Sequence, residues 1–251
     1  MEERTNQLRQ IQAKLVKSER LAAIGELAAM VGHDLRNPLT GIKAATYYLK
    51  GKCMLEEGSK AKEMFQMIDD CIDQSNKIVN DLLEYSRMTK IDVKQANPKE
   101  VILHSLALVK KPENIHVKID VNEETLVKID QSKIIRVFTN VIRNAFDAMP
   151  DGGNLLIKSI LTQTTWDVAF TDSGVGMSRE TLGKLGYPLF TTKAKGMGFG
   201  IPICKRIVEA HGGKLLIEST LGKGTTITIS LPTSPKLEEP GSSLAVNELE
   251  L

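Results

Sequence analysis

A seven-residue repeat runs through residues 59–88. Its apolar and small residues alternate spacings of three and four, as in helices that pack side by side. Gly51 and Gly58 precede the repeat, and Ser59 is a suitable N-cap for its helix. The sequence therefore predicts a helix with one continuous packing face. The repeat consists of Phe65, Ile68, Ile72, Ser75, Val79, Leu82 and Ser86.

A long amphipathic helix is also predicted ahead of this repeat. Residues 5–50 contain Pro38 as their one internal proline, and their apolar residues recur at helical spacing. The two segments together predict a helical hairpin. The apolar positions of the first helix are Ile24, Leu27, Val31, Leu35, Leu39, Ile42, Ala45 and Leu49.

A hairpin of this kind leaves one broad apolar stripe uncovered, since aromatic residues are only 4% of the chain. Two-helix units bury such stripes by pairing into four-helix bundles, so we expect a homodimer. Residues 1–20 continue the periodicity weakly and indicate a coiled-coil stub. The hairpin is predicted to span residues 21–90.

The pattern changes to alternating strands and helices over residues 97–233. Helices are expected from Pro98, over 132–149 and over 201–211, among strands with β-rich composition. We therefore predict an α+β chain whose second domain is a sandwich, a sheet covered on one face by helices. Residues 234–251 turn to Pro, Ser, Gly and Glu and indicate a flexible tail. The expected strands are 116–121, 125–130, 154–162, 165–172, 214–220 and 224–232.

The overall charge excludes a general attraction to nucleic acid. Lys and Arg number 33 against 31 for Asp and Glu, which leaves a formal charge of +2. No apolar run approaches the roughly 18 residues of a membrane span, and the first residues show no signal sequence. The three scattered cysteines indicate reduced, structural thiols. We expect a cytoplasmic protein, or the cytoplasmic part of a longer, membrane-anchored sensor.

The sequence GHDLRNPL, residues 32–39, could capture a phosphoryl group. On a helix His33 and Asn37 share a face, and Asp34 can lean back toward the imidazole edge. A neutral imidazole offers one lone pair, and a carboxylate on its other ring N–H stabilises the cation that forms on attack. Pro38 allows a bend beside this turn. A solvent-facing histidine in an ordinary helix is the alternative.

Asparagines one turn apart on a later helix could hold a metal ion. Asn140 and Asn144 lie on one face of the predicted helix 132–149. Amide oxygens are neutral ligands suited to a magnesium ion that bridges phosphates. The spacing alone is a weak indication.

Two glycine-rich segments could contact a nucleotide. Asp172 ends a predicted strand and could accept a hydrogen bond from an exocyclic amine, while Gly174 and Gly176 permit positive φ and close approach of a planar ring. Farther on, glycines precede a helix, whose N-terminus favours phosphate. They are Gly196, Gly198 and Gly200.

Other residues receive structural interpretations. His104 and His116 are predicted to be structural, and so is His211, which ends a helix where a cation would suit the dipole. Trp166 is expected in the core or at its rim. The turn GKGTT, residues 222–226, leads into the last strand, where it is either a hairpin turn or a nucleotide contact.

Together these motifs resemble the catalytic core of two-component sensor histidine kinases over residues 20–232. GHDLRNPL is similar to that family's phosphoacceptor box, NVIRNAFDA to its asparagine box and PLFTTK to its phenylalanine box. DSGVGM, GMGFG and GKGTT are similar to its glycine boxes. The resemblance implies a dimerisation and phosphotransfer hairpin joined to an ATP-binding sandwich shared with gyrase and Hsp90-type chaperones.

The resemblance also implies roles for individual residues. His33 would be phosphorylated, Asp34 would activate it, and Asn37 would act when phosphoryl groups are removed from the partner. Asn144, assisted by Asn140, would bind Mg²⁺. The implied ATP contacts are Asn140, Asn144, Asp172, Gly174, Gly176, Lys193, Gly196, Gly198, Gly200 and Thr225. The implied partners are a response regulator, a second copy of the chain and an upstream sensor.

Three departures from the family pattern stand out. Asp34 takes the place of a more usual Glu, and Pro202 that of Ala. Asp147 stands where many members have a basic residue, so that help for the phosphates must come from Arg143, Lys193 or Lys195. Two alternatives to a kinase stay open: a nucleotide-binding scaffold or phosphatase-dominated regulator, and a sandwich ATPase of chaperone or mismatch-repair type.

Overall fold

The computed structural model describes residues 32, 34–51, 59–86, 91–121, 125–187, 190–191 and 198–233. The chain divides into two compact units. The first is Met1–Met88 with Thr192–Phe199, and the second is Thr89–Thr191 with Gly200–Leu251. Among the described helices, none has the length and apolar composition needed to cross a membrane.

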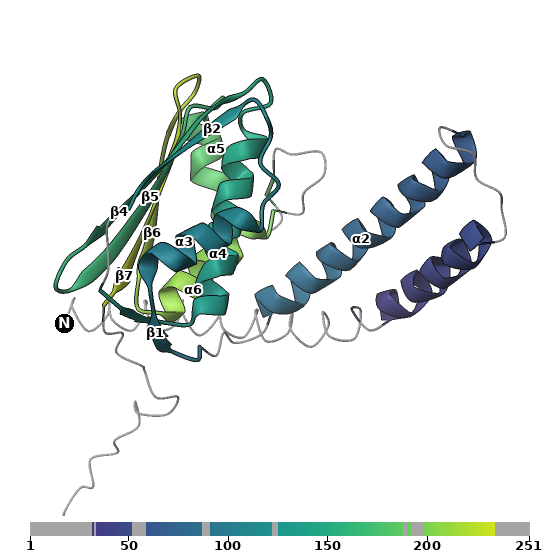
Figure 1. Cartoon of the computed structure of the whole chain (residues 1–251), viewed down its shortest axis with the longest axis horizontal. Helices are drawn as coiled ribbons and strands as arrows, with labels where there is room; N and C mark the ends of the chain where they lie inside the picture. Colours follow the sequence, from purple (N-terminus) through teal and green to yellow (C-terminus); the bar gives the residue numbers. More distant parts are fainter. Residues whose placement is uncertain are drawn as a thin grey trace, which may run out of the picture. The chain divides into compact units, whose positions relative to one another are not determined.

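The first unit contains the predicted helical hairpin (Figure 1). Residues 34–51 form its first helix, and α2, Lys60–Ser86, forms its second. The Ser59 side chain accepts a hydrogen bond from the Lys62 N–H at 3.3 Å, as expected of an N-cap. The predicted helices are therefore confirmed over their described residues, while residues 1–20 lie outside them.

Gly32 lies where the first helix packs against large residues of α2. Ile72, Val79 and Leu83 of α2 are buried, and so are Gly32 and Thr46 of the first helix. A Cβ at Gly32 would lie 3.0 Å from the Leu83 side chain and 3.1 Å from that of Val79. Gly32 thus lets the two helices approach closely just before His33.

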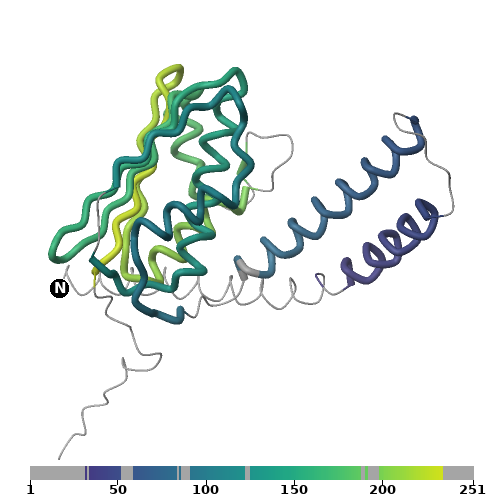
Figure 2. The backbone as a smooth tube through the Cα atoms, viewed as in Figure 1, coloured from purple at the N-terminus to yellow at the C-terminus, as the bar shows by residue number. Residues whose placement is uncertain are grey.

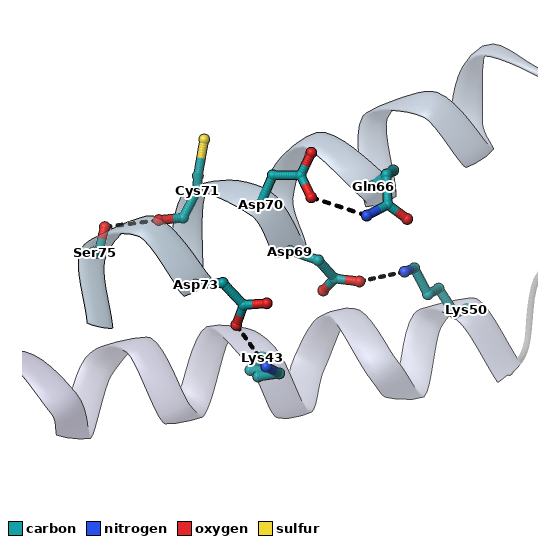
Figure 3. Close-up of polar contacts among 8 residues, drawn as sticks. All are labelled: Lys43, Lys50, Gln66, Asp69, Asp70, Cys71, Asp73 and Ser75. Carbon is teal, nitrogen blue, oxygen red and sulfur yellow. Dashed lines mark hydrogen bonds and ion pairs between the residues drawn. The ribbon is translucent and has the colours of Figure 1, made fainter. Parts of the chain in front are cut away.

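Polar contacts fix the register of the two helices. Lys43 Nζ lies 2.8 Å from an Asp73 oxygen, and Lys50 Nζ lies 2.5 Å from Asp69 (Figure 3). Ion pairs at the protein surface contribute about 0 to 1 kcal/mol each, and the Lys50 to Asp69 pair is half-buried. Their spacing of seven residues on the first helix nevertheless favours one alignment of the pair.

The second unit is the predicted α+β sandwich. Its five-stranded sheet has the order β2-β4-β5-β7-β6, in which β2 and β4 are parallel and the other neighbours antiparallel. The helices lie on one side of this sheet, and Figure 2 traces the same layers as a tube. The elements are β1 Lys94–Ala96, α3 Pro98–Ala107, β2 Ile115–Asp120, β3 Val127–Ile129, α4 Gln131–Asp147, β4 Gly153–Leu161, β5 Thr165–Asp172, α5 Arg179–Lys184, α6 Gly200–Ala210, β6 Lys214–Thr220 and β7 Gly224–Pro232.

The core lies between the sheet and helix α4. Trp166 is fully buried, which confirms its expected place in the core, and its ring meets Phe138 of α4 edge-on at 5.7 Å between centroids. Its indole N–H donates to the Ser159 hydroxyl at 2.8 Å. The bulky ring is thus buried with its polar atom satisfied.

Strand β1 was not predicted from the sequence. It is only three residues long and pairs with β3, a segment more than thirty residues later. Two residues before it, the Asp92 N–H donates to Asp130 Oδ2 at 3.0 Å. The structured part of this unit therefore begins before Asn97, whose side chain caps α3.

The structure corrects the expectation that His211 suits a cation. His211 is 1% exposed, and its Nε2 accepts the Asp130 N–H at 3.0 Å. Because Nε2 accepts, the proton is on Nδ1, which donates to the Ile207 carbonyl at 2.7 Å. Burial lowers the pKa of His211 below its ordinary 6.5. The histidine is therefore neutral, and desolvation outweighs the helix dipole.

Acidification should destabilise this unit through His211. Above pH 6.5 the side chain is neutral in the folded and the unfolded chain. Below that pH the unfolded chain takes up a proton that the folded one resists, so the free energy of unfolding falls by at most about 1.4 kcal/mol per pH unit. Urea unfolding between pH 7 and 5 measures the loss. His211→Gln should reduce the slope, and an unchanged slope would contradict this assignment.

Candidate functional site

Asp172 is held rigidly at the end of β5. Its side chain is buried, and its Oδ1 accepts the N–H of Gly174 at 2.9 Å and that of Thr225 at 3.2 Å. Both hydrogen bonds go to one oxygen, so Oδ2 can accept from an exocyclic amine. Burial raises the pKa of the carboxyl group, while the two N–H groups oppose the rise.

Thr225 reaches Asp172 from a neighbouring strand. The two residues are cross-strand partners of β7 and β5. The Thr225 hydroxyl is also within 2.9 Å of the Ser219 hydroxyl. The turn GKGTT is thus the hairpin turn between β6 and β7, and at the same time it supplies a backbone donor to the site.

The glycines after Asp172 lie against backbone carbonyls. Gly176 has a φ of 62°, and a Cβ there would lie 2.0 Å from the Thr220 oxygen. A Cβ at Gly174 would lie 2.4 Å from the Ala148 oxygen. Of the two, only Gly176 has a positive φ, whereas position 174 requires glycine because of its contact with the end of α4.

Helix α4 brings Asn140 beside the start of α6. The Asn140 side-chain amide donates to the Gly200 carbonyl at 3.5 Å. A Cβ at Gly200 would lie 2.9 Å from Asn140 Oδ1, so a larger residue there would displace this amide. Asn144 lies one turn farther along α4 and is partly exposed. The two amide oxygens are a donor set that fits Mg²⁺ together with water and phosphate.

Some predicted residues lie outside the described part of the chain. These include His33, Lys193, Lys195 and Gly196. Gly198 is described and has a φ of 70°, two residues before α6 begins. The glycine turn therefore leads into a helix N-terminus, as expected of a phosphate contact.

Residues on the hairpin and on α4 are accessible to solvent. Asp34 and Asn37 are exposed on the first hairpin helix. Arg143 and Asp147 are exposed on α4. An exposed carboxylate and amide one turn apart can act on a reacting partner without first being uncovered.

Sequence reasoning missed two backbone groups of the site. The carbonyls of Ala148 and Thr220 set the path of residues 174–176, and the Val175 carbonyl accepts the Gly222 N–H at 2.7 Å. Every residue type has a backbone carbonyl, so the sequence does not show which carbonyls belong to a site. Only the glycines opposite them indicated a close approach.

Two family models match the chain. Residues 23–91 match the His Kinase A (phospho-acceptor) domain, and residues 129–235 match the histidine kinase-, DNA gyrase B- and HSP90-like ATPase. The first match covers the hairpin, and the second begins at the end of β3.

Curated relatives and solved structures agree with these matches. The chain is 30% identical to sporulation kinase E of Bacillus subtilis and 33% identical to sensor histidine kinase ZraS of Escherichia coli K12, in each case over 92% of this chain. It spans only 31% and 50% of their lengths.

The catalytic domain of histidine kinase ThkA is 30% identical over 57% of this chain and 97% of its own length, with a TM-score of 0.53. The structure of histidine kinase ThkA in complex with response regulator protein TrrA is 27% identical, with a TM-score of 0.63. This match covers 91% of this chain and 67% of the solved chain. ShkA with AMPPNP, at 17% identity and a TM-score of 0.72, covers 85% of this chain and 47% of its own and has the same fold.

Proposed function

The chain belongs to the sensor histidine kinases, with a phospho-acceptor (HisKA) domain ahead of an ATPase (HATPase_c) domain, and we propose that it is an ATP-dependent protein histidine kinase. It phosphorylates itself on His33 and passes the phosphoryl group to an aspartate of a response regulator. The same hairpin also assists removal of phosphate from that regulator. An upstream sensor provides the input.

One observation carries this proposal. The chain combines two parts. One is the segment GHDLRNPL in the hairpin. The other is a domain in which two backbone N–H groups hold Asp172 and the Gly200 carbonyl holds the Asn140 amide. A gyrase-like or chaperone-like ATPase has the second part and no need of the first. The hairpin histidine therefore favours phosphotransfer over ATP hydrolysis alone.

Each site residue has a distinct task in this proposal. Asp172 accepts the adenine amine on Oδ2, and Asn144 with Asn140 holds Mg²⁺, which neutralises charge on the phosphates when bound. The remaining nucleotide contacts are Gly174, Gly176, Lys193, Gly196, Gly198, Gly200 and Thr225.

The hairpin residues handle the phosphoryl group. The free ring nitrogen of His33 attacks the γ-phosphorus, and the bond to the leaving ADP oxygen breaks. Asp34 holds the other ring N–H and stabilises the imidazolium. Asn37 positions a water against the regulator's phosphoryl group when phosphate is removed.

We place the domain boundaries at 21–90 for the hairpin and 97–233 for the ATP-binding domain, with a stub at 1–20 and a tail at 234–251. Strand β1 and Asp92 support adding the preceding few residues to the ATP-binding domain. We place this core in the cytoplasm, where ATP and response regulators are available.

Incubation with ATP labelled in its γ-phosphate tests the proposal. A phosphohistidine label is labile in acid and stable in base, and it should transfer to a regulator's receiver domain. A chain that binds ATP but incorporates no label would instead support a nucleotide-binding scaffold or phosphatase-dominated regulator.

Uncovered apolar residues support a homodimer. In the seven-residue repeat of α2, Ile72 and Val79 are buried. Ile68, which belongs to the other set of repeat positions, is 38% exposed. On the first helix Leu35, Ile42 and Leu49, seven residues apart, are 45 to 48% exposed. A second hairpin would cover this stripe and complete a four-helix bundle.

Ile68→Glu should therefore dissociate the dimer while leaving the single hairpin folded, because the new charge enters only the interface between copies. Light scattering and sedimentation would report a monomer with unchanged helicity. The adjacent Met67 is 65% exposed outside the heptad positions, so Met67→Glu is the matched control and should stay dimeric. A wild-type monomer at micromolar concentration would contradict the bundle.

A further inference from the structure

Three polar contacts join helix α4 to helix α6. At one end the Asp130 N–H, at the N-cap of α4, donates to Nε2 of His211, the residue that follows α6, at 3.0 Å. In the middle Cys204 Sγ donates to the Val137 carbonyl at 3.9 Å. At the other end lies the 3.5 Å contact between the Asn140 amide and the Gly200 carbonyl.

The spacing of these contacts corresponds to one antiparallel register. They are separated by seven and three residues on α4, from Asp130 to Asn140, and by seven and four on α6, from His211 back to Gly200. At about 1.5 Å per residue, both helices cover about 15 Å between the end contacts. The histidine end therefore lies about 15 Å from the pair that belongs to the proposed site.

The contact at His211 is the shortest of the three, and it is buried. Thiols are weak donors, and 3.5 Å is long for an amide hydrogen bond. Both helices also bury apolar residues, such as Val141 on α4 and Ile207 on α6, and apolar contacts are not directional. Of these three contacts, the one at His211 is thus the strongest directional restraint on the axial register.

Asp130 is itself held in place. Its Oδ1 accepts from the Ser132 hydroxyl at 2.7 Å and from the Lys133 N–H at 3.1 Å, and its Oδ2 accepts the Asp92 N–H. Although burial opposes it, these hydrogen bonds lower the pKa of Asp130, so the carboxylate stays charged. The Asp130 N–H that donates to His211 therefore belongs to a residue whose side chain is held by three hydrogen bonds.

We propose that His211 is a positioning residue that sets the register of α4 against α6 and thereby keeps Asn140 beside Gly200 at the start of α6, with Asn144 one turn farther along α4. The proposal rests on the nucleotide-binding role proposed above. His211 itself contacts neither nucleotide nor metal. It acts from the opposite end of both helices.

Two substitutions separate the contacts of the imidazole. Gln at position 211 places its amide oxygen near the position of Nε2, where it can accept the Asp130 N–H. Asn reaches only as far as Nδ1, so it keeps the local contact with Ile207 and loses the contact between the helices. His211→Asn should break the register, and His211→Gln should retain it.

Ser159→Ala provides a control for lost stability. It removes the buried acceptor of the Trp166 indole N–H, within the sheet and outside α4 and α6. Like His211→Asn, it leaves one buried donor unpaired, so the two variants should lower the melting temperature by similar amounts. Binding is compared at a temperature where circular dichroism shows all variants folded.

Calorimetry with Mg²⁺ and a non-hydrolysable ATP analogue measures the effect in the full chain. We expect the Kd of His211→Asn to rise about tenfold and its autophosphorylation rate to fall up to about a hundredfold, the order that a misplacement of about 1 Å produces. His211→Gln and Ser159→Ala should both stay within about threefold of wild type. Wild-type binding by His211→Asn would overturn the proposal. So would an equal loss of affinity in Ser159→Ala or in His211→Gln.

A second readout does not depend on nucleotide. The side-chain amide resonances of Asn140 report its contact with Gly200, and they should shift in His211→Asn but not in the other two variants. Unshifted Asn140 resonances in His211→Asn would also overturn the proposed register. If wild type binds no nucleotide while these shifts occur as expected, the proposed function fails and the register stands.

Discussion

Replacing His33 by Gln should abolish covalent labelling from γ-labelled ATP while leaving ATP affinity unchanged. Gln is close to His in size and polarity, but its amide nitrogen has no lone pair free for attack on phosphorus. The proposed nucleotide contacts all lie in the ATPase domain, so binding should persist. The expected result is a complete loss of acid-labile label with a Kd within about twofold of wild type, since no binding contact is removed.

His104→Gln is the matched control for this experiment. His104 is exposed on α3, and its removal should leave labelling intact. Full labelling of His33→Gln would place the phosphorylated residue elsewhere. Loss of labelling in both variants would indicate that the substitutions act through the fold.

Replacing Asn144 by Ala should abolish both labelling and the magnesium-dependent part of ATP affinity. A methyl group cannot replace an amide oxygen as a metal ligand, and Asn144 would hold the Mg²⁺ that neutralises charge on the phosphates. The position is partly exposed near the end of α4, and Ala favours helix, so the domain should remain folded. Calorimetry with and without Mg²⁺ measures the difference, which should be at least tenfold in Kd in the presence of the metal.

Gln131→Ala removes an exposed amide from the first turn of the same helix and should change neither quantity. An Asn144→Ala variant that binds ATP with full magnesium dependence would move the metal site to other residues. His33→Gln removes the residue that accepts the phosphoryl group, whereas Asn144→Ala weakens binding of the nucleotide. The two variants therefore distinguish these two causes of lost labelling.

Most of the secondary structure could be predicted because it depends on local patterns. The six predicted strands and the helices from Pro98, 132–149 and 201–211 are all present, with ends shifted by only a few residues. Strand β1 was missed because three residues carry no periodicity. It forms because β3 offers it a partner from farther along the chain.

The residue types of the candidate site could be proposed from the sequence, but the contacts that hold these residues in place could not. Asp172, Asn140 and Gly200 were chosen for chemistry, and the fold gives each of them fixed neighbours. The sequence shows that Gly174 permits a positive φ, but its contact with the Ala148 carbonyl is what requires glycine there. Such contacts join segments that are distant in sequence, so no local window contains them.

By itself the sequence indicated the family and most of the helices and strands, and it proposed residues for the chemistry, because hydrophobic period and motif spacing are local properties. The tertiary structure alone decided which residues meet. It paired His211 with Asp130 across 81 positions, buried the imidazole and made it neutral where the helix dipole favoured a cation. Desolvation and hydrogen-bond direction depend on what surrounds a group in space, and that is set by the packing of α4 on α6.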